Sequence, residues 1–122
     1  MRIFIAEDSI IVRERLVDMI EETDGMEVVG QSGSVRAAEE QIAALKPDVT
    51  LLDVRLSDGN SFEVLAAIRN GSLDTQVIMM SENPFEQYRT EAKRLGAVQF
   101  FDKSKEFEKI VPTLMQMKER RK

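Results

Sequence analysis

The sequence has 122 residues, of which 43% are hydrophobic and 32% are charged, and its net charge is −5. This length suits one domain with a single core, and the negative charge argues against a general nucleic-acid-binding surface. The sequence has no cysteine and no histidine, which excludes disulfides and Cys–zinc sites and restricts any metal to a hard, oxygen-preferring ion such as Mg²⁺.

The N-terminal apolar run, residues 3–6, does not have the form of an export signal. It is too short for a signal peptide and is followed at once by Glu7 and Asp8. No stretch of the sequence approaches the length of a transmembrane helix. We therefore expect a cytoplasmic protein that has no membrane partner and makes no direct contact with nucleic acid.

Short apolar runs alternate with stretches of helical periodicity along the chain. The expected strands are residues 3–6, 26–30, 48–52, 76–80 and 98–101. A helix is expected after each strand, with apolar residues at helical spacing on its inner face. In chain order, these inner residues are Val12, Leu16, Met19 and Ile20; Ala38, Ile42 and Leu45; Val64, Leu65 and Ile68; Tyr88, Ala92 and Leu95; and Phe107, Ile110, Val111, Leu114 and Met117.

Capping signals predict where the helices begin. The expected N-caps of the first three helices are Asp8 or Ser9, then Ser34, then Ser61. Residues 83–86 combine an Asn cap with Pro at the first and Glu at the third following position, which predicts that the fourth helix begins there. Pro112 either kinks the fifth helix or marks its true start.

This alternation predicts an α/β fold, a doubly wound (βα)5 sandwich of three layers with a five-stranded parallel sheet in the middle. We expect one domain over residues 1–122. Residues 118–122 are basic, and we expect either a helix end that the helix dipole favours or the start of a linker.

Four of the expected strands end in residues that can do chemistry. Glu7 and Asp8 follow the first strand, Asp53 the third, Ser81 the fourth, and Lys103 lies just past the fifth. Because the carboxyl ends of parallel strands meet at one edge of a sheet, we expect these side chains to lie together. Each has an ordinary explanation when taken alone, such as a turn or a surface lysine, and their coincidence favours a site.

The residue types in this cluster suit phosphate chemistry. Three neighbouring carboxylates repel one another, and Mg²⁺ removes that repulsion while it also accepts waters and a phosphate. Ser81 and Lys103 are of the types that bind phosphoryl oxygens. In the absence of histidine and cysteine the expected nucleophile is a carboxylate, and Asp53 lies between the acidic pair and the Ser81–Lys103 side.

With these residues in place, the sequence from Ile3 to about Met117 resembles the receiver domain of bacterial two-component response regulators. The matching features are the pair Glu7-Asp8, Asp53 with Arg55-Leu56 after it, Ser81, and Gly96-Ala97 leading to Phe100-Phe101-Asp102-Lys103. The resemblance implies a flavodoxin-like fold with strand order 2-1-3-4-5.

The resemblance also implies a role for each site residue. Asp53 would accept a phosphoryl group from a histidine kinase or a phosphotransfer protein. The implied Mg²⁺ ligands are Glu7, Asp8, Asp53 and the backbone carbonyl of Arg55. Ser81 would donate a hydrogen bond to the phosphoryl oxygens and Lys103 would pair with them. Such a domain assists its own phosphorylation and dephosphorylation and is not an enzyme with a separate substrate.

Phe100, three residues before Lys103, matches the aromatic switch position of the family. Movement of Ser81 toward the phosphoryl group would vacate space into which Phe100 can turn, burying apolar surface. The face made by the fourth helix, the fifth strand and the fifth helix would change, and we expect a protein partner or a second copy to bind it near Tyr88 and Arg89. The alternative is that Phe100 is always ordinary core.

The sequence departs from the family pattern at several positions. Ser57 replaces a frequent Pro, Ser61 a frequent Gly, Glu82 a small residue, and Ser104 a Pro that is preceded by a cis bond. A cis bond before a residue other than proline costs about 2.5–4 kcal/mol. Arg55 and Asn83 each lie two residues past a site residue, where we expect them to tune dephosphorylation.

Two other functions compete with the receiver. A haloacid-dehalogenase-like Mg²⁺ phosphohydrolase also forms an aspartyl phosphate, but it needs a second Asp where this chain has Arg55. A pseudo-receiver, which binds partners without phosphate, is favoured by Glu82 and Ser104.

Overall fold

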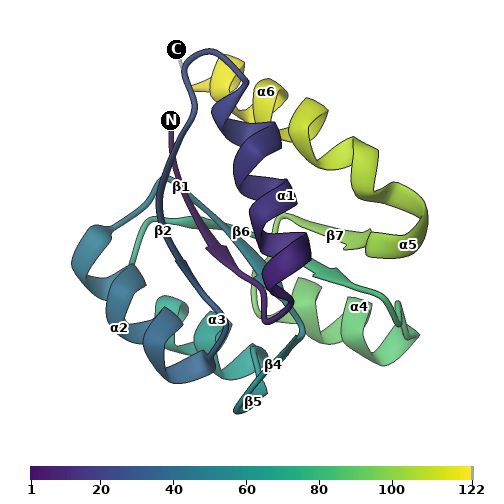
Figure 1. Cartoon of the computed structure of the whole chain (residues 1–122). Coiled ribbons are helices and arrows are strands. Elements are labelled where there is room, and N and C mark those ends of the chain that lie inside the picture. The colour runs from purple at the N-terminus through teal and green to yellow at the C-terminus, as the bar shows by residue number, and fades with distance from the viewer. Residues whose placement is uncertain (122) are drawn as a thin grey trace.

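A five-stranded parallel sheet lies between two layers of helices in the computed structural model, which describes residues 1–121 (Figure 1). Its strands are β1 (Arg2–Ala6), β2 (Glu27–Ser32), β3 (Val49–Asp53), β6 (Gln76–Ser81) and β7 (Gln99–Asp102). They are ordered β2-β1-β3-β6-β7, which is the predicted order 2-1-3-4-5. The predicted three-layer α/β fold is confirmed.

The helices divide between the two faces of the sheet (Figure 1). One face is covered by α1 (Ile10–Glu21) and α6 (Ile110–Arg120), and the other by α2 (Val35–Leu45), α3 (Phe62–Asn70) and α4 (Glu86–Arg94). A single turn, α5 (Lys103–Glu106), and a 3₁₀ turn at Phe107–Lys109 lead into α6. Within residues 1–121, none of the helices is long and apolar enough to cross a membrane.

Two hydrophobic cores form because successive residues of a strand face opposite sides of the sheet. Ile5 and Leu51 pack with α1 and α6, whereas Phe4 packs with α2, α3 and α4. The same alternation, continued to the ends of β1 and β3, turns Glu7 and Asp53 toward the α1–α6 side. The apolar pattern of the strands therefore also sets the direction in which the Glu7 and Asp53 side chains point.

Two of the predicted helix caps are present. The Ser9 hydroxyl accepts a hydrogen bond from the Val12 amide at 3.3 Å, and the Ser34 hydroxyl accepts one from the Ala37 amide at 3.2 Å. A second acceptor was not predicted: Asp58 Oδ1 lies 2.5 Å from the Val35 amide nitrogen. This bond lowers the pKa of Asp58 and ties the loop after β3 to the start of α2.

Ser61 occupies the predicted cap position of α3, but its side chain makes no capping hydrogen bond. Ser61 precedes α3 but has helical backbone angles (φ −76°, ψ −2°), whereas a capping side chain needs an extended backbone. Asn60 Oδ1 accepts the hydrogen bond from the Phe62 amide instead, at 2.8 Å. The buried Ser61 hydroxyl has no hydrogen-bond partner among the described residues.

The fourth helix begins within the predicted range 83–86, at Glu86, but the predicted Asn83 cap is wrong, because Phe85 is at the cap position. The Asn83 carbonyl accepts hydrogen bonds from the Phe85 amide and from the Ser81 hydroxyl. These bonds close a turn before the helix and use groups that a cap would need.

Other boundaries differ by one or two residues, and β2 runs to Ser32 rather than residue 30. The small hairpin of β4 (Arg55–Leu56) and β5 (Gly59–Asn60) was not predicted. Pro112 lies in the first turn of α6 and so marks its start, where no amide hydrogen bond is lost.

Residues 118–120 belong to α6, as predicted for a helix end. Lys118 Nζ donates to the Asp24 carbonyl and Arg121 pairs with Asp48 at 2.9 Å, so this basic segment is tied to the N-terminal edge of the sheet. Lys122, the last residue of the predicted basic tail, lies outside the described residues.

The two serines preceding α2 and α3 give a paired stability prediction. We expect Ser61→Ala to raise the free energy of unfolding by about 1 kcal/mol, because a buried hydroxyl without a partner is removed. Ser34→Ala should lower it by about 1 kcal/mol, because a working cap is lost. Urea denaturation of the two variants and the wild type measures both signs; a destabilised Ser61→Ala would contradict the unpaired hydroxyl.

Candidate functional site: an acidic cluster at the carboxyl edge of the sheet

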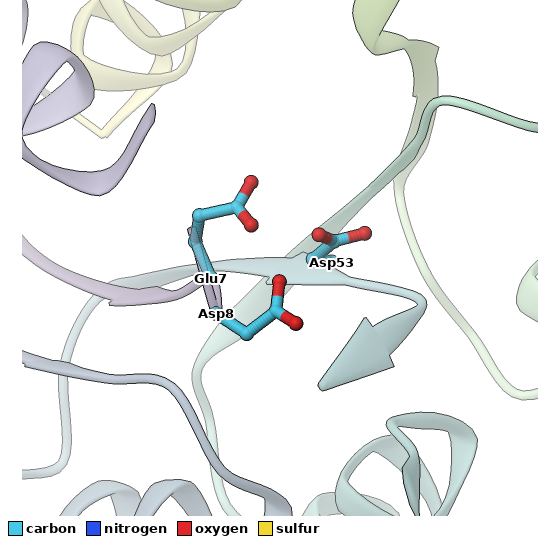
Figure 2. Close-up of side chains that lie close together, drawn as sticks. All are labelled: Glu7, Asp8 and Asp53. Atoms are coloured by element: carbon cyan, nitrogen blue, oxygen red, sulfur yellow. The ribbon is translucent and has the colours of Figure 1, made fainter. Parts of the chain in front are cut away.

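Side chains from four strands meet at the carboxyl edge of the sheet. Neighbouring strands pair Ala6 with Leu52, Asp53 with Met80, and Ser81 with Asp102. This register brings the predicted residues Glu7, Asp53, Ser81 and Lys103 to one edge. Figure 2 shows the carboxyl groups of Glu7 and Asp8, from the loop after β1, turned toward Asp53 at the end of β3.

The Lys103 ammonium lies between two buried carboxyl groups. Its Nζ donates to Glu7 Oε1 at 2.5 Å and to Asp53 Oδ2 at 2.9 Å. Glu7 has no exposed surface, Asp53 is 6% exposed and the Lys103 side chain is 7% exposed. Glu7 Oε2 also accepts the Ser9 amide at 3.1 Å. The sequence predicted this meeting of residues but not the bridge between the two acids.

Burial makes the charges of this cluster interdependent. The pKa of Asp53 is raised to about 7 from an ordinary value of 3.8. Burial is the largest cause of this rise, and the neighbouring Glu7 is the next largest. Burial also acts to raise the pKa of Glu7, but hydrogen bonds from Asp53 and Lys103 outweigh it and lower this pKa. Burial acts to lower the pKa of Lys103, but the two carboxylates outweigh it and the pKa is raised. Lys103 therefore stays charged.

A cavity of about 230 Å³ opens above the buried acids. Asp8 and Arg55, both exposed, line it together with Asp53. One carboxylate oxygen each from Glu7, Asp8 and Asp53 lie within 4.8 Å of one another, close enough to share one metal ion. Glu82, which departs from the small residue of the family pattern, lines the same cavity.

The Ser81 hydroxyl is engaged within its own loop. It accepts the Asn83 amide at 3.0 Å and donates to the Asn83 carbonyl at 3.1 Å. Ser81 and Asn83 both line the cavity, as the sequence predicted for residues that act there. To donate to a ligand in the cavity, however, the hydroxyl has to leave the Asn83 carbonyl.

Phe100 is half-buried and packs against the core on the α4 side of the sheet. The Arg89 guanidinium carbon lies 5.0 Å from the centre of its ring. Tyr88 instead packs against Phe62 and Phe85, with ring centres 5.9 and 5.3 Å apart. Phe100 is thus neither fully inside the core nor free in solvent.

The backbone after Lys103 lacks the cis bond that the family pattern has at this position. No cis peptide bond occurs in residues 1–121, so the bond between Lys103 and Ser104 is trans. Asp102 Oδ1 accepts the Ser104 amide at 2.9 Å and the Ser104 hydroxyl at 2.6 Å, and Glu106 Oε1 accepts the Asp102 amide at 3.0 Å. These bonds cap the turn α5 and fix the backbone from which Lys103 extends.

Arg13 is a residue near the site that the sequence analysis missed. Its guanidinium donates to the Glu7 carbonyl at 2.8 Å. Arg13 had no signal of its own, because a bond from a helix side chain to a loop carbonyl produces no apolar period and no chemical motif.

Comparison with protein families and curated proteins gives concordant matches. The model of the response regulator receiver domain matches residues 3–115. The chain is 26% identical over 121 residues to sensory transduction protein LytT of Bacillus anthracis, covering 99% of this chain and 48% of that protein. It is 32% identical over 97 residues to the DNA-binding transcriptional activator DevR/DosR of Mycobacterium tuberculosis, covering 80% of this chain and 45% of that protein. The chain spans about half the length of these curated relatives.

Solved structures agree with these matches. The response regulator domain of Thermotoga maritima CheB superposes with a TM-score of 0.83 at 32% identity, covering 96% of this chain and 92% of the other. A DNA-binding response regulator of the LuxR family from Staphylococcus aureus gives a TM-score of 0.87 at 25% identity, covering 94% and 96%.

The raised pKa of Asp53 predicts how stability depends on pH in metal-free protein. Between about pH 4 and 7 the folded chain keeps a proton on Asp53 that the unfolded chain has released, so the free energy of unfolding of the wild type falls progressively as the pH rises to 7. Asp53→Asn does not titrate, and we expect it to raise Tm most above pH 7 and least near pH 4. Thermal melts in EDTA across this range measure the difference, and an equal gain at pH 5 and pH 8 would contradict the prediction.

Proposed function

The chain belongs to the response regulator receiver family, and from that premise we propose that Asp53 is the phosphoacceptor of a two-component phosphorelay. The observation that carries the proposal is the pairing of Asp53 with Lys103, beneath a cavity that Asp8 also lines. The donor would be a phosphohistidine of a histidine kinase or of a phosphotransfer protein. An Asp53 oxygen would form a bond to phosphorus while the phosphorus–nitrogen bond breaks and its electron pair returns to the imidazole.

The donor atoms suit Mg²⁺. The three carboxylates with oxygens within 4.8 Å are hard ligands, and the open cavity leaves room for waters and a phosphoryl group. Glu7, Asp8, Asp53 and the Arg55 carbonyl would hold the ion. When bound, Mg²⁺ would offset the negative charge of the phosphoryl oxygens and of the carboxylates.

Lys103 and Ser81 would hold the phosphoryl group from the side of β6 and β7. Lys103 already lies 2.9 Å from Asp53 and carries the positive charge that a new phosphoryl oxygen needs. Ser81 would exchange its bond to the Asn83 carbonyl for a charge-assisted bond to phosphate. Arg55 and Asn83, both at the cavity, would tune the lifetime of the phosphoryl group.

The signal would leave through α4, β7 and α6. Movement of Ser81 would loosen the turn that precedes α4, and Phe100 would turn further inward from under Arg89. The changed face would bind a protein partner or a second copy of the chain. The domain would act in the cytoplasm as a signalling module that assists its own phosphorylation, without turnover of a separate substrate.

Intact mass spectrometry after incubation with acetyl phosphate and Mg²⁺ tests the phosphoacceptor. We expect the wild type to gain one phosphoryl group and Asp53→Asn to gain none, because the only carboxylate nucleophile in the proposed step is removed. Asp8→Ala should need a higher Mg²⁺ concentration for the same rate. An unmodified wild type would favour a pseudo-receiver, and modification retained in Asp53→Asn would place the acceptor elsewhere.

The switch is tested with beryllofluoride and Mg²⁺, which mimic the phosphoryl group. We expect amide NMR signals to shift both in the loop after β1 and in residues 83–100. Ser81→Ala should keep the first set of shifts and lose most of the second, because the hydroxyl that leaves Asn83 is absent. Identical shifts in wild type and Ser81→Ala would show that Ser81 does not transmit the change to residues 83–100.

A further inference from the structure

Arg13 reaches back from α1 to the loop that carries the acidic pair. The loop residue Glu7 is held at each polar group: its amide donates to the Ser32 carbonyl at 2.9 Å, its carbonyl accepts from Arg13 Nη1 at 2.8 Å, and its carboxyl group binds Lys103 and the Ser9 amide. The Arg13 bond therefore fixes the plane of the peptide that joins Glu7 to Asp8.

Gly33, in the loop between β2 and α2, leaves the space that the Arg13 guanidinium occupies. A Cβ atom at this position would lie 2.8 Å from Arg13 Nη1 and 3.4 Å from the Asp8 Cα. The φ angle of Gly33 is not positive, so the backbone conformation does not require glycine here. Glycine leaves room here for the Arg13 guanidinium, the flexible end of a side chain that an added Cβ would displace, whereas the distance to the Asp8 Cα is an ordinary contact.

The same loop also holds the segment after Asp53. The Gly33 carbonyl accepts a hydrogen bond from the Ser57 amide at 3.0 Å. The loops after β1, β2 and β3 are thus joined through Ser32 and Gly33, and Arg13 closes the connection on the side of Asp8. Glu7 is directed into the protein toward Lys103, and its neighbour Asp8 is directed to the cavity.

We propose that Arg13, seated on Gly33, is a positioning residue that holds Asp8 in place for Mg²⁺ binding. The inference rests on the proposed function, because it assigns Asp8 to the metal. Arg13 acts through the Glu7 carbonyl and not as a ligand.

The sign of the effect separates positioning from charge. By Coulomb's law alone, removal of a cation near a dication site strengthens Mg²⁺ binding. Loss of a positioning contact weakens it, by about 10- to 100-fold for contacts that orient metal ligands. We therefore expect Arg13→Ala to lower Mg²⁺ affinity about tenfold, with Arg13→Lys closer to wild type because an ammonium can still donate to the carbonyl.

Arg15→Ala is the matched control, because it removes the same charge from the same helix. The Arg15 guanidinium carbon lies 4.4 Å from the centre of the Phe107 ring, and its side chain is exposed. We expect its Mg²⁺ affinity to equal or exceed that of the wild type. Affinity is measured from amide NMR shifts during a Mg²⁺ titration without phosphate, and melts in EDTA verify that each variant is folded.

Gly33→Ala tests the packing in a double-mutant cycle. The new Cβ should displace the guanidinium, so Gly33→Ala alone should weaken Mg²⁺ binding much as Arg13→Ala does. In the Arg13→Ala background the same change should have little further effect, because the atom that it displaces is gone. Equal effects of Gly33→Ala in both backgrounds would overturn the link between the two residues.

The outcomes distinguish this inference from the proposed function. If the wild type binds Mg²⁺ and is phosphorylated on Asp53, but Arg13→Ala binds Mg²⁺ as well as or better than wild type, Arg13 does not position Asp8. If the wild type fails to bind Mg²⁺, the proposed function itself fails. Weaker binding in Arg13→Ala, recovery in Arg13→Lys and unchanged binding in Arg15→Ala support the inference.

Discussion

The Lys103 ammonium between Glu7 and Asp53 is the interaction on which the rest of the site depends. Two carboxyl groups with almost no exposed surface cannot both ionise side by side without a compensating charge. Lys103 supplies that charge at 2.5 and 2.9 Å. Removal of Lys103 would leave two buried acids without a compensating charge, which is strongly destabilising. The three residues therefore act as a unit.

The sheet topology brings this unit together. Lys103 and Glu7 are far apart in the sequence, and β1 and β7 are separated in the sheet by β3 and β6. Because all of these strands run in parallel, their carboxyl ends lie at one edge and a long lysine side chain can span the distance. The order β2-β1-β3-β6-β7 places Asp53 next to Glu7 on one side and next to Ser81 on the other.

The sequence was sufficient to predict the fold and the meeting of several side chains at the carboxyl edge of the sheet. Alternating apolar runs identified the strands, and chemistry-bearing residues at the strand ends identified Glu7, Asp53 and Lys103. Both signals are local and repeat along the chain, so they can be read without coordinates. The resemblance to receiver domains added the strand order, which the topology confirms.

What could not be predicted depends on competition between nearby groups. Ser61 looked like a cap, but the Asn60 side chain takes the hydrogen bond. Asn83 looked like the cap of α4, but its carbonyl closes a turn with Ser81 and Phe85 before the helix. The Arg13 bond joins two elements through a backbone atom. In each case the outcome depends on three-dimensional distances that residue types do not encode.

The loop of Glu7 and Asp8 and the turn at Ser81 differ in how far their hydrogen bonds extend to other parts of the chain. Around Glu7 and Asp8, hydrogen bonds connect separate loops through Ser32, Gly33 and Ser57. Around Ser81, the side-chain hydrogen bonds remain within one short turn, and they lead to a helix, α4, whose one fully buried residue is Ala92. Segments with few buried apolar contacts open at the lowest free energy. A ligand that accepts a hydrogen bond from the Ser81 hydroxyl would therefore disturb α4 before it disturbs the loop of Glu7 and Asp8. This difference gives a physical reason why a signal from the proposed site would travel toward α4 and β7.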